Sequence, residues 1–305
     1  MHNKFKGLYA ANIVPLNKDR SINYTELKNH IKDLLEQGIN NFLVNGHAGE
    51  NFTLTLEEQV KILQTIRGII KKNNLIISGL NFESVTDGLK YSKLFQKNGA
   101  DALLIFPPNS WSLSRDEQTI VNQHQIIANH IKIPLFFYQS SIYSHGLNYS
   151  NKIHAKLIKI KNIIGVKEGS WNSKSYIKNF NFLKKQKKNF LVMASGDEHL
   201  YDGFKYGSDG SMVSLAILMP KQINQMIKLI HNKKFKEAKK LDLQILSLAK
   251  IIYGNHPGSH ATARLKYCLK LQKKISHDLT RSIIKISDYD KKILKKTLKK
   301  LKLID

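Results

Sequence analysis

The sequence predicts an α/β protein, a closed TIM-type (β/α)8 barrel followed by a helical extension at the C-terminus. Short apolar runs alternate with helix-like segments from the N-terminus to about residue 220, which is the pattern of parallel βαβ units. Eight such runs favour closure into a barrel, although an open doubly wound sheet also fits the alternation. The predicted strands are residues 8–15, 41–45, 75–80, 102–106, 135–138, 163–167, 190–194 and 210–214.

Two of the helices between these strands carry clear start signals. Asn23 with Glu26, and Thr55 with Glu58, are spaced as capping boxes, and apolar residues then recur at helical intervals. Beyond about residue 220 the strands stop, and we expect helices at residues 221–231, 234–252, 259–273 and 288–303. We therefore divide the chain into a barrel domain, residues 1–220, and a helical appendage, residues 221–305.

Composition excludes several classes of protein. With 305 residues and 42% hydrophobic content the chain can bury a large core, so we expect it to be ordered. The single cysteine, Cys268, excludes a disulfide framework and a cysteine-based zinc site, and we expect it to be buried in a helix. The sequence shows neither a membrane-spanning apolar stretch nor a signal peptide, so we expect a cytoplasmic protein without a membrane partner.

The formal net charge of +26 raises the question of nucleic-acid binding. The basic residues are almost all lysine, whereas groove-reading proteins favour arginine, and no nucleic-acid motif accompanies the lysines. The densest basic run, residues 291–302, has its apolar residues on one helical side, as an amphipathic helix with a solvated face would. We therefore expect no nucleic-acid partner, and we attribute to the charge an attraction for small anions.

In a barrel of this type the reactive groups lie at the C-terminal ends of the strands. Lys167 closes the apolar run 162–167 and is expected to point into the barrel mouth. Burial of an ammonium there lowers its pKa, and a neutral amine is the species that attacks a keto carbon. From position, a salt-bridged structural lysine fits equally well. Tyr138 closes the neighbouring strand, where its hydroxyl would relay protons, although packing at the rim of the core is the simpler interpretation.

Five short motifs occur along the chain: VNGxxGE at 44–50, LTxEE at 54–58, PxxxY at 134–138, GVKE at 165–168 and SGD at 195–197. Through them the chain resembles, over nearly its whole length, the family of dihydrodipicolinate synthases and N-acetylneuraminate lyases. The resemblance implies a (β/α)8 barrel with C-terminal helices, usually a homotetramer, that uses no metal and no organic cofactor. It implies that Lys167 forms an imine with the substrate and that Tyr138 shuttles protons. The glycine-rich loop would hold the keto-acid carboxylate through Gly46, Ala48 and Gly49.

The glycine-rich loop departs from the family pattern. Family members commonly have two threonines where this chain has His47 and Ala48. Because Ala48 has no hydroxyl, the carboxylate would rest on backbone N–H groups near Ala48 and Gly49. His47 would lie near Tyr138 and extend a proton relay that titrates near neutrality, and a structural histidine bonded to the backbone is the alternative.

Two further departures argue against dihydrodipicolinate synthase activity. Those enzymes carry an arginine shortly after the strand-5 tyrosine, which grips a second carboxylate, whereas residues 139–146 read QSSIYSHG. The aromatic pair that they carry after strand 4 is replaced by PPNSW, which ends at Trp111. Whether Trp111 takes over that role, in its own site or in a neighbouring chain's, is left open.

The segment after the seventh strand points to a different substrate. Asp197 and Glu198, with Gly207 and Ser214 further on, resemble the hydroxyl-binding residues of the neuraminate lyases. Ionised carboxylates accept several hydroxyl protons and therefore suit a polyhydroxylated tail. The alternative is that the two acids cap a helix at residues 199–206.

These observations together predict an aldolase. Neutral Lys167 would attack C2 of a 2-keto acid, and the resulting iminium would accept electrons as the C3–C4 bond breaks, which releases pyruvate and an aldehyde. We favour a 2-keto-3-deoxy sugar-type acid as the small-molecule substrate and a homotetrameric assembly. A dehydratase of the same family uses the same residues and stays open, followed by dihydrodipicolinate synthase and by a non-catalytic basic barrel with a binding or regulatory role.

Overall fold

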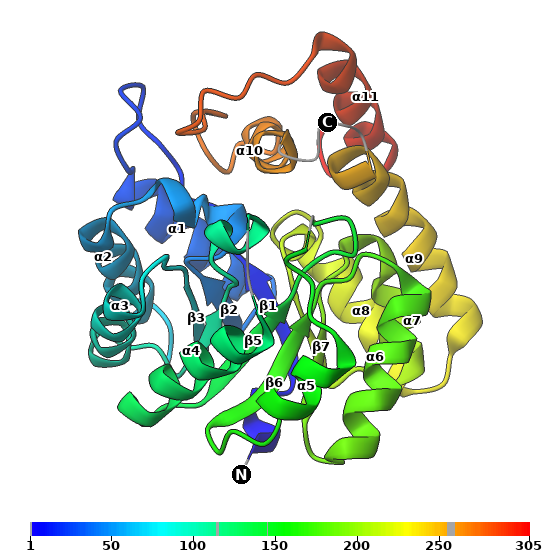
Figure 1. Cartoon of the computed structure of the whole chain (residues 1–305). Coiled ribbons are helices and arrows are strands. Elements are labelled where there is room, and N and C mark those ends of the chain that lie inside the picture. The colour runs from blue at the N-terminus through cyan, green and yellow to red at the C-terminus, as the bar shows by residue number, and fades with distance from the viewer. Residues whose placement is uncertain (1, 114–115, 145, 255–259) are drawn as a thin grey trace.

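The computed structural model describes residues 2–113, 116–144, 146–254 and 260–305, and within them eight parallel strands form a closed barrel (Figure 1). Each strand pairs with the next one in the sequence, and β8 closes the barrel on β1. The predicted fold class is thereby confirmed. The strands are β1 Gly7–Ala11, β2 Asn41–Val44, β3 Ile76–Leu80, β4 Ala102–Ile105, β5 Leu135–Gln139, β6 Ile163–Glu168, β7 Leu191–Ala194 and β8 Gly210–Val213.

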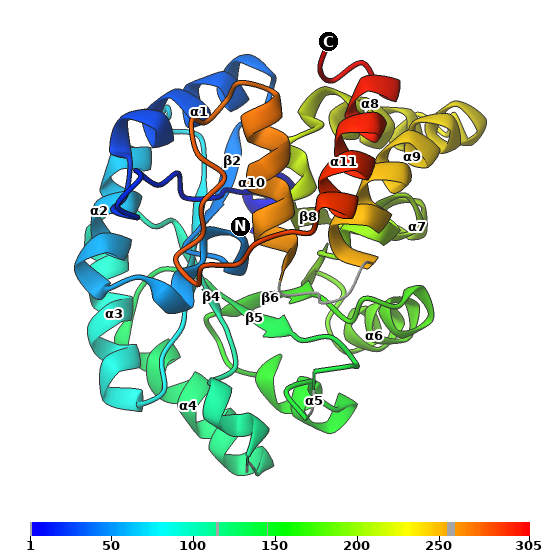
Figure 2. The same cartoon turned by 90° about the horizontal axis from the view of Figure 1, so that it is seen from above.

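Helices α1 to α8 follow the strands one by one and surround the barrel, as the view from above shows (Figure 2). They are α1 Tyr24–Glu36, α2 Leu56–Arg67, α3 Val85–Lys97, α4 Glu117–His130, α5 Asn151–Leu157, α6 Ser173–Gln186, α7 Leu200–Tyr206 and α8 Pro220–His231. Short 3₁₀ turns are His2–Phe5, His47–Gly49, Asn51–Thr53, Asn109–Ser112, Asp197–His199 and Leu215–Ile217.

The chain then continues as a helical extension, in agreement with the prediction. Its elements are α9 Phe235–Ala249, a π-helical turn Lys250–Gly254, α10 Ala261–Leu271 and α11 Asp288–Lys300. Residue 259, where the third predicted helix starts, lies outside the described residues. In Figure 1 α10 lies above the barrel, at the end away from the N-terminus, which places it over the C-terminal ends of the strands.

Burial on both faces of the strands explains their near-continuous apolar runs. One set of side chains, including Tyr9 and Phe136, fills the interior of the barrel. The opposite set packs under the surrounding helices, in a core that extends to Leu248 of α9 and Leu298 of α11. Because this core runs across residue 220 without a break, the division of the chain at that residue stays a prediction.

The two predicted capping boxes have different outcomes. Thr55 and Glu58 form a complete box, because each side chain accepts a hydrogen bond from the other's backbone N–H. The side chain of Asn23 accepts from the N–H of Glu26 at 2.9 Å, but the Glu26 carboxylate accepts from the N–H and hydroxyl of Ser276. The reciprocal half of that box is therefore a wrong prediction, because a distant segment supplies a better donor pair.

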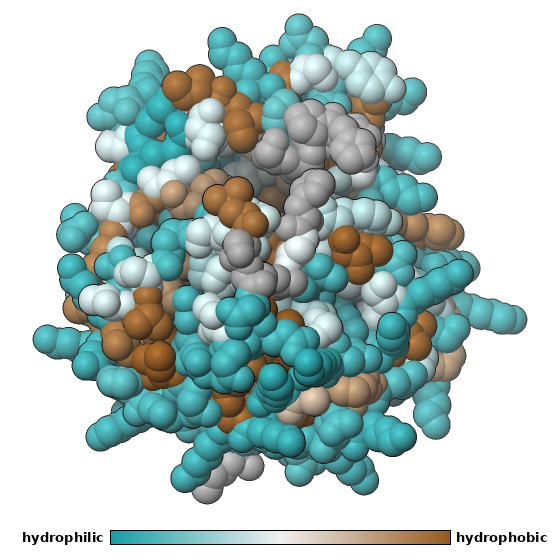
Figure 3. Space-filling model, in the orientation of Figure 1, coloured by the Kyte–Doolittle hydropathy of each residue, from teal (hydrophilic) through white to brown (hydrophobic). Residues whose placement is uncertain are grey.

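The lysine-rich end of the chain behaves as a solvated helix face. In α11, Leu294 and Leu298 are buried while most of the lysines point outward. Hydrophilic side chains cover most of the face seen in Figure 3, and hydrophobic ones are scattered among them. Cys268 is buried in α10, as expected. No helix in the described ranges is long and apolar enough to cross a membrane.

Candidate active site

A cavity of about 580 Å³ opens at the C-terminal ends of the strands, with α10 forming one wall. The predicted residues that line it are His47, Ala48, Tyr138, Lys167, Asp197, Glu198 and Ser214. The structure therefore brings together side chains from the ends of β2, β5, β6, β7 and β8. Aromatic residues that the sequence analysis did not single out complete the wall, namely Phe52, Tyr143, Trp171 and Tyr253.

Lys167 lies near the end of β6 and is only 9% exposed. Its ammonium is 5.2 Å from the ring centre of Tyr138 and 6.0 Å from that of Phe106. Burial lowers the pKa of Lys167 to about 8, against the opposing influence of the Asp197 carboxylate. Within the described part of the chain no ion pair involves Lys167, so the salt-bridged interpretation has no support. A substantial fraction of the amine is neutral near physiological pH.

Tyr138 lies beside Lys167, since these two residues are partners in the β5–β6 register. The phenol is buried, and burial raises its pKa to about 12. The Trp171 side chain acts in the opposite direction, and the charges of Glu168 and Asp197 raise the pKa further. Tyr138 is therefore a protonated phenol at neutral pH, available as a donor within the cavity.

His47 lies where the sequence analysis placed it, close to Tyr138. Its ring stacks on Phe106 at 4.1 Å between centroids and meets the Tyr138 ring edge-on at 5.7 Å. The surrounding protein atoms lower the pKa of His47, and the positive charge of Lys167 lowers it further. Because the side chain of His47 is exposed in the cavity, its titration near neutrality stays a prediction.

The glycines of the loop after β2 have a structural role. The N–H of Gly49 donates to the carbonyl of Gly46 at 3.0 Å, which closes the 3₁₀ turn. It is therefore not available to a substrate carboxylate, contrary to the prediction, and neither glycine lines the cavity. Ala48 does line it, and its backbone N–H keeps the predicted role as a proposal.

Asp197 lies in the cavity wall, on the turn after β7. Its Oδ1 accepts the N–H of Leu215 at 2.6 Å. The hydroxyl oxygens of Tyr253 and Ser214 lie 2.5 Å apart, and either hydroxyl can be the donor. Burial raises the pKa of Asp197 to about 7, against the lowering effects of the Leu215 N–H, the charge of Lys167 and Tyr253. Asp197 is thus close enough to Lys167 for the two charges to interact.

The alternative of helix capping is excluded. Helix α7 begins after His199 and has no side-chain cap, so neither acid caps it. Glu198 is half-buried in the cavity wall, and burial raises its pKa. Gly207 ends α7 in the left-handed region, at φ 108°, and does not line the cavity.

Trp111 is not among the described residues that line the cavity of its own chain. It is 6% exposed, belongs to the core under the helices, and its ring centre lies 6.5 Å from that of Tyr149. Among the described residues no group of three His, Cys, Asp or Glu side chains is arranged to hold a metal ion.

Two aromatic residues of the cavity had no strong signal in the sequence. Tyr253 belongs to the π-helical turn after α9, 39 positions beyond Ser214 at the end of the last predicted strand, so no strand-end argument reaches it. Trp171 follows Lys167 by four positions, on the loop after β6. The rule that loops after barrel strands build the site includes this position, and it is the one signal that points to Trp171.

The closed barrel and the cavity at its strand ends define an enzyme of the (β/α)8 class, and comparison with known proteins makes it a carbon–carbon lyase. The chain belongs to the dihydrodipicolinate synthetase family, whose model matches residues 4–301. Among curated relatives, 4-hydroxy-tetrahydrodipicolinate synthase from Sulfurihydrogenibium sp. is 30% identical over 252 residues, 82% of this chain and 83% of the relative. The same activity is named for a relative from Wigglesworthia glossinidia brevipalpis, 28% identical over 81% of both chains.

Solved structures of the family share the fold. A monomeric dihydrodipicolinate synthase variant superposes with a TM-score of 0.89 at 20% identity, covering 99% of this chain and 98% of its own. A prophage protein of the family from E. coli K12, solved in complex with pyruvate, gives a TM-score of 0.88 at 18% identity, covering 98% of this chain and 99% of its own.

Proposed function

We propose that this chain is a Schiff-base-forming aldolase that cleaves or condenses a 2-keto acid, with pyruvate as the keto-acid part. One observation carries the proposal: Lys167 is a buried lysine, outside every ion pair of the described residues, with its pKa lowered to about 8, in the wall of a cavity that Tyr138 also lines. Lysine nucleophiles that attack carbonyl groups are activated by desolvation in this way. The complex of a family member with pyruvate supports pyruvate as the ligand class.

The mechanism uses two side chains in turn. The amine of Lys167 attacks C2 of the keto acid, and loss of water leaves an iminium that accepts the electron pair of the C3–C4 bond. Tyr138 gives its proton to the hydroxyl that leaves as water, and its phenolate then accepts the C4 hydroxyl proton as the C3–C4 bond breaks and an aldehyde departs. One proton returns to C3 of the enamine, and water then releases pyruvate and restores the amine. The N–H of Ala48 is the candidate anchor for the carboxylate.

The charge of the cavity favours a hydroxylated substrate tail. Lys167 is the only lysine or arginine among the lining residues that the structure describes, whereas Asp197 and Glu198 are both present. Since Asp197 already accepts the N–H of Leu215, Glu198 is the better placed acceptor for substrate hydroxyls. A 2-keto-3-deoxy sugar acid fits this arrangement.

Dihydrodipicolinate synthesis is the second candidate, because the curated relatives carry that name. A dipicolinate has two carboxylates, so the aldehyde that condenses with pyruvate must contribute one. A second carboxylate next to two acids, without a further cation in the described lining, is electrostatically unfavourable. A dehydratase that eliminates water from the same iminium uses the same residues and is separated by its product.

The imine on Lys167 is tested with pyruvate and borohydride. We expect reduction to leave one stable adduct, located by peptide mass spectrometry on Lys167 and absent from Lys167→Ala. Its rate of formation should rise with pH through about 8, because the neutral amine is the nucleophile. Lys266 is the internal control, since it is fully buried but paired with Glu50 at 2.5 Å. Labelling spread over surface lysines, with Lys167 unmodified, would end the aldolase hypothesis.

The substrate class is tested by product analysis. We expect pyruvate release from 2-keto-3-deoxy sugar acids, and condensation of pyruvate with polyhydroxylated aldehydes faster than with an aldehyde that carries a carboxylate. The reverse preference would establish dihydrodipicolinate synthesis. Loss of water without release of an aldehyde would establish the dehydratase.

A further inference from the structure

Gly169 directly follows β6 and lies against the phenol of Tyr138. A Cβ atom built on Gly169 would come within 2.7 Å of the Tyr138 ring and 2.8 Å of its hydroxyl oxygen. Both distances lie well inside the separation of about 3.5–4.0 Å at which non-bonded carbon atoms pack. The phenol therefore occupies the space that any side chain at position 169 would need.

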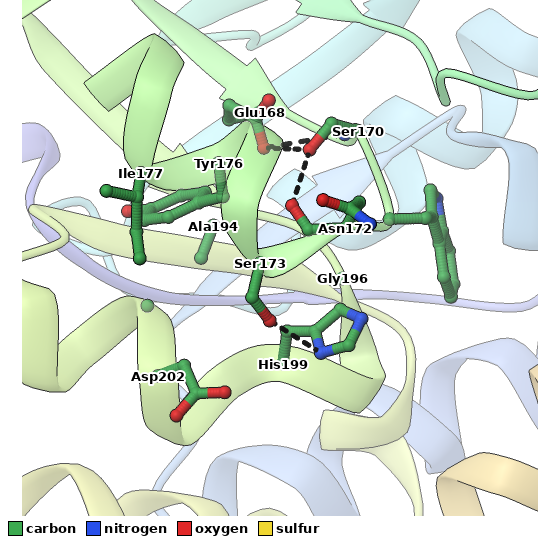
Figure 4. Close-up of a pocket in the computed structure, with 12 residues that line it drawn as sticks. Glu168, Ser170, Asn172, Ser173, Tyr176, Ile177, Ala194, Gly196, His199 and Asp202 are labelled. Atoms are coloured by element: carbon green, nitrogen blue, oxygen red, sulfur yellow. Dashed lines mark hydrogen bonds between the residues drawn. The ribbon is translucent and has the colours of Figure 1, made fainter. Parts of the chain in front are cut away.

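Hydrogen bonds hold the loop on both sides of this glycine. The N–H of Gly169 donates to the carbonyl of Gln139 at 2.9 Å, and a Cβ on Gly169 would also lie 2.9 Å from that carbonyl oxygen. The buried Glu168 carboxylate accepts the Asn179 amide of α6 at 2.8 Å and the Ser170 hydroxyl at 3.1 Å, and Figure 4 shows the contact between Glu168 and Ser170. Because the loop is tied to β5 and α6, the phenol is the group that an added Cβ would displace.

The position of this phenol matters because of what lies around it. The ammonium of Lys167 is 5.2 Å from the centre of the Tyr138 ring. Phe106 and His47 meet the same ring edge-on, at 5.1 Å and 5.7 Å between centroids. Gly169 is thus one of a set of close neighbours that fix the phenol beside the reacting amine.

We propose that Gly169 is a positioning residue for this reaction: because it has no side chain, the Tyr138 phenol can lie beside Lys167, where it reaches the substrate protons. This inference rests on the proposed function. The backbone of Gly169 lies outside the left-handed region, so alanine is conformationally allowed there and its effect comes from the Cβ alone. A displacement of about 1 Å at a reacting group can cost roughly a hundredfold in rate.

The kinetic test is a double-mutant cycle of Gly169→Ala with Tyr138→Phe. In the parent, Gly169→Ala should lower kcat by about tenfold to a hundredfold, while borohydride still traps pyruvate on Lys167. In the Tyr138→Phe background the hydroxyl that carries the proton is already absent, so the same substitution should change kcat by less than about twofold. A parent-like kcat in Gly169→Ala, or equal losses in the two backgrounds, would overturn the inference.

Gly88→Ala is the matched control for crowding in general. Gly88 lies in α3, outside the cavity lining, and a Cβ there would come within 3.0 Å of Phe82 and Ile127. Overpacking of this kind acts on stability, and we expect Gly88→Ala to leave kcat unchanged. A loss of kcat as large as that of Gly169→Ala would show that crowding anywhere in the fold lowers turnover, and would overturn the inference.

A second test reads the position of the phenol without using activity. 3-Fluorotyrosine introduces ¹⁹F into all 12 tyrosines, and the signal that is lost in Tyr138→Phe belongs to Tyr138. Gly169→Ala should shift this resonance, and Gly88→Ala should leave it in place. An unmoved Tyr138 resonance in Gly169→Ala would overturn the inference. If the parent forms no pyruvate adduct but the resonance shifts, the proposed function fails while the steric placement of Tyr138 stands.

Discussion

At the scale of single residues, Tyr138 offers the cleanest separation of binding from catalysis. Its hydroxyl moves protons in the proposed mechanism, whereas the imine itself forms on Lys167. Tyr138→Phe should therefore still form the borohydride-trapped pyruvate adduct, while turnover falls by about 10²–10⁴-fold, the usual scale of lost acid–base help. Turnover within a few-fold of the parent would mean that another group carries the proton.

Asp197 should set the pH at which Lys167 reacts. Its carboxylate raises the pKa of Lys167, so removing the negative charge leaves only the burial that lowers it. In Asp197→Asn the pH midpoint of pyruvate trapping should therefore move below that of the parent. Glu198→Gln is the matched control, since Glu198 does not act on the Lys167 pKa and should leave the midpoint in place. A midpoint that rises in Asp197→Asn would contradict this electrostatic role.

Which site residues the sequence could predict depends on how each one reaches the cavity. Lys167, Tyr138 and Asp197 end or follow strands, and the barrel geometry carries every strand end to one rim, so a strand pattern is sufficient to group them. Tyr253 reaches the cavity because the helical extension packs over the barrel, and no short sequence motif predicts that packing. Trp171 adopts a left-handed backbone conformation that its side chain does not favour, so the residue type does not predict this conformation.

At the scale of elements, the predicted strand bounds agree with the structure except where a segment is buried without being paired in the sheet. The first run was predicted at residues 8–15, but β1 ends at Ala11. Ile13 and Val14 are nonetheless buried, because the segment after the strand packs into the core without pairing. Apolar content therefore located the element and overestimated its length, since hydrophobic patterning reports burial rather than hydrogen bonding.

The loop after β2 is tied to the helical extension by a buried ion pair. Glu50 accepts Lys266 of α10 at 2.5 Å through one oxygen and the N–H of Arg281 at 2.8 Å through the other. Glu50→Gln leaves a fully buried ammonium without its counter-charge, and we expect a loss of about 3–5 kcal/mol in the free energy of unfolding by chemical denaturation.

The matched control for this pair lies on the surface. Lys234 and Glu237 are 57% and 58% exposed, and Glu237→Gln should change stability by less than about 1 kcal/mol. The double substitution Glu50→Gln with Lys266→Met should recover much of the loss, because it also removes the buried ammonium that would have no counter-charge. Equal losses in Glu50→Gln and Glu237→Gln would show that the buried pair does not hold the loop on α10.

At the scale of the whole molecule, exposed apolar side chains indicate where copies of the chain associate. Three large apolar side chains are exposed on loops at the active-site end of the barrel: Phe52 by 58%, Leu113 by 90% and Tyr143 by 72%. They follow β2, β4 and β5, so they share one end of the fold. Stable interfaces bury apolar anchors of this kind over about 800 Å² per partner. We therefore expect this end to face a second copy.

Light scattering at micromolar concentration should report a homotetramer, four times the 34.9 kDa of the chain. The net charge of +26 opposes association, so the assembled fraction should rise with salt as the repulsion is screened. Leu113→Glu should shift the mass to a smaller species while circular dichroism stays unchanged. Leu243→Glu, at an equally apolar side chain that is 58% exposed on α9, is the control and should leave the mass unaltered. A monomer under all these conditions would contradict the prediction and would place this chain with the monomeric variant among its structural neighbours.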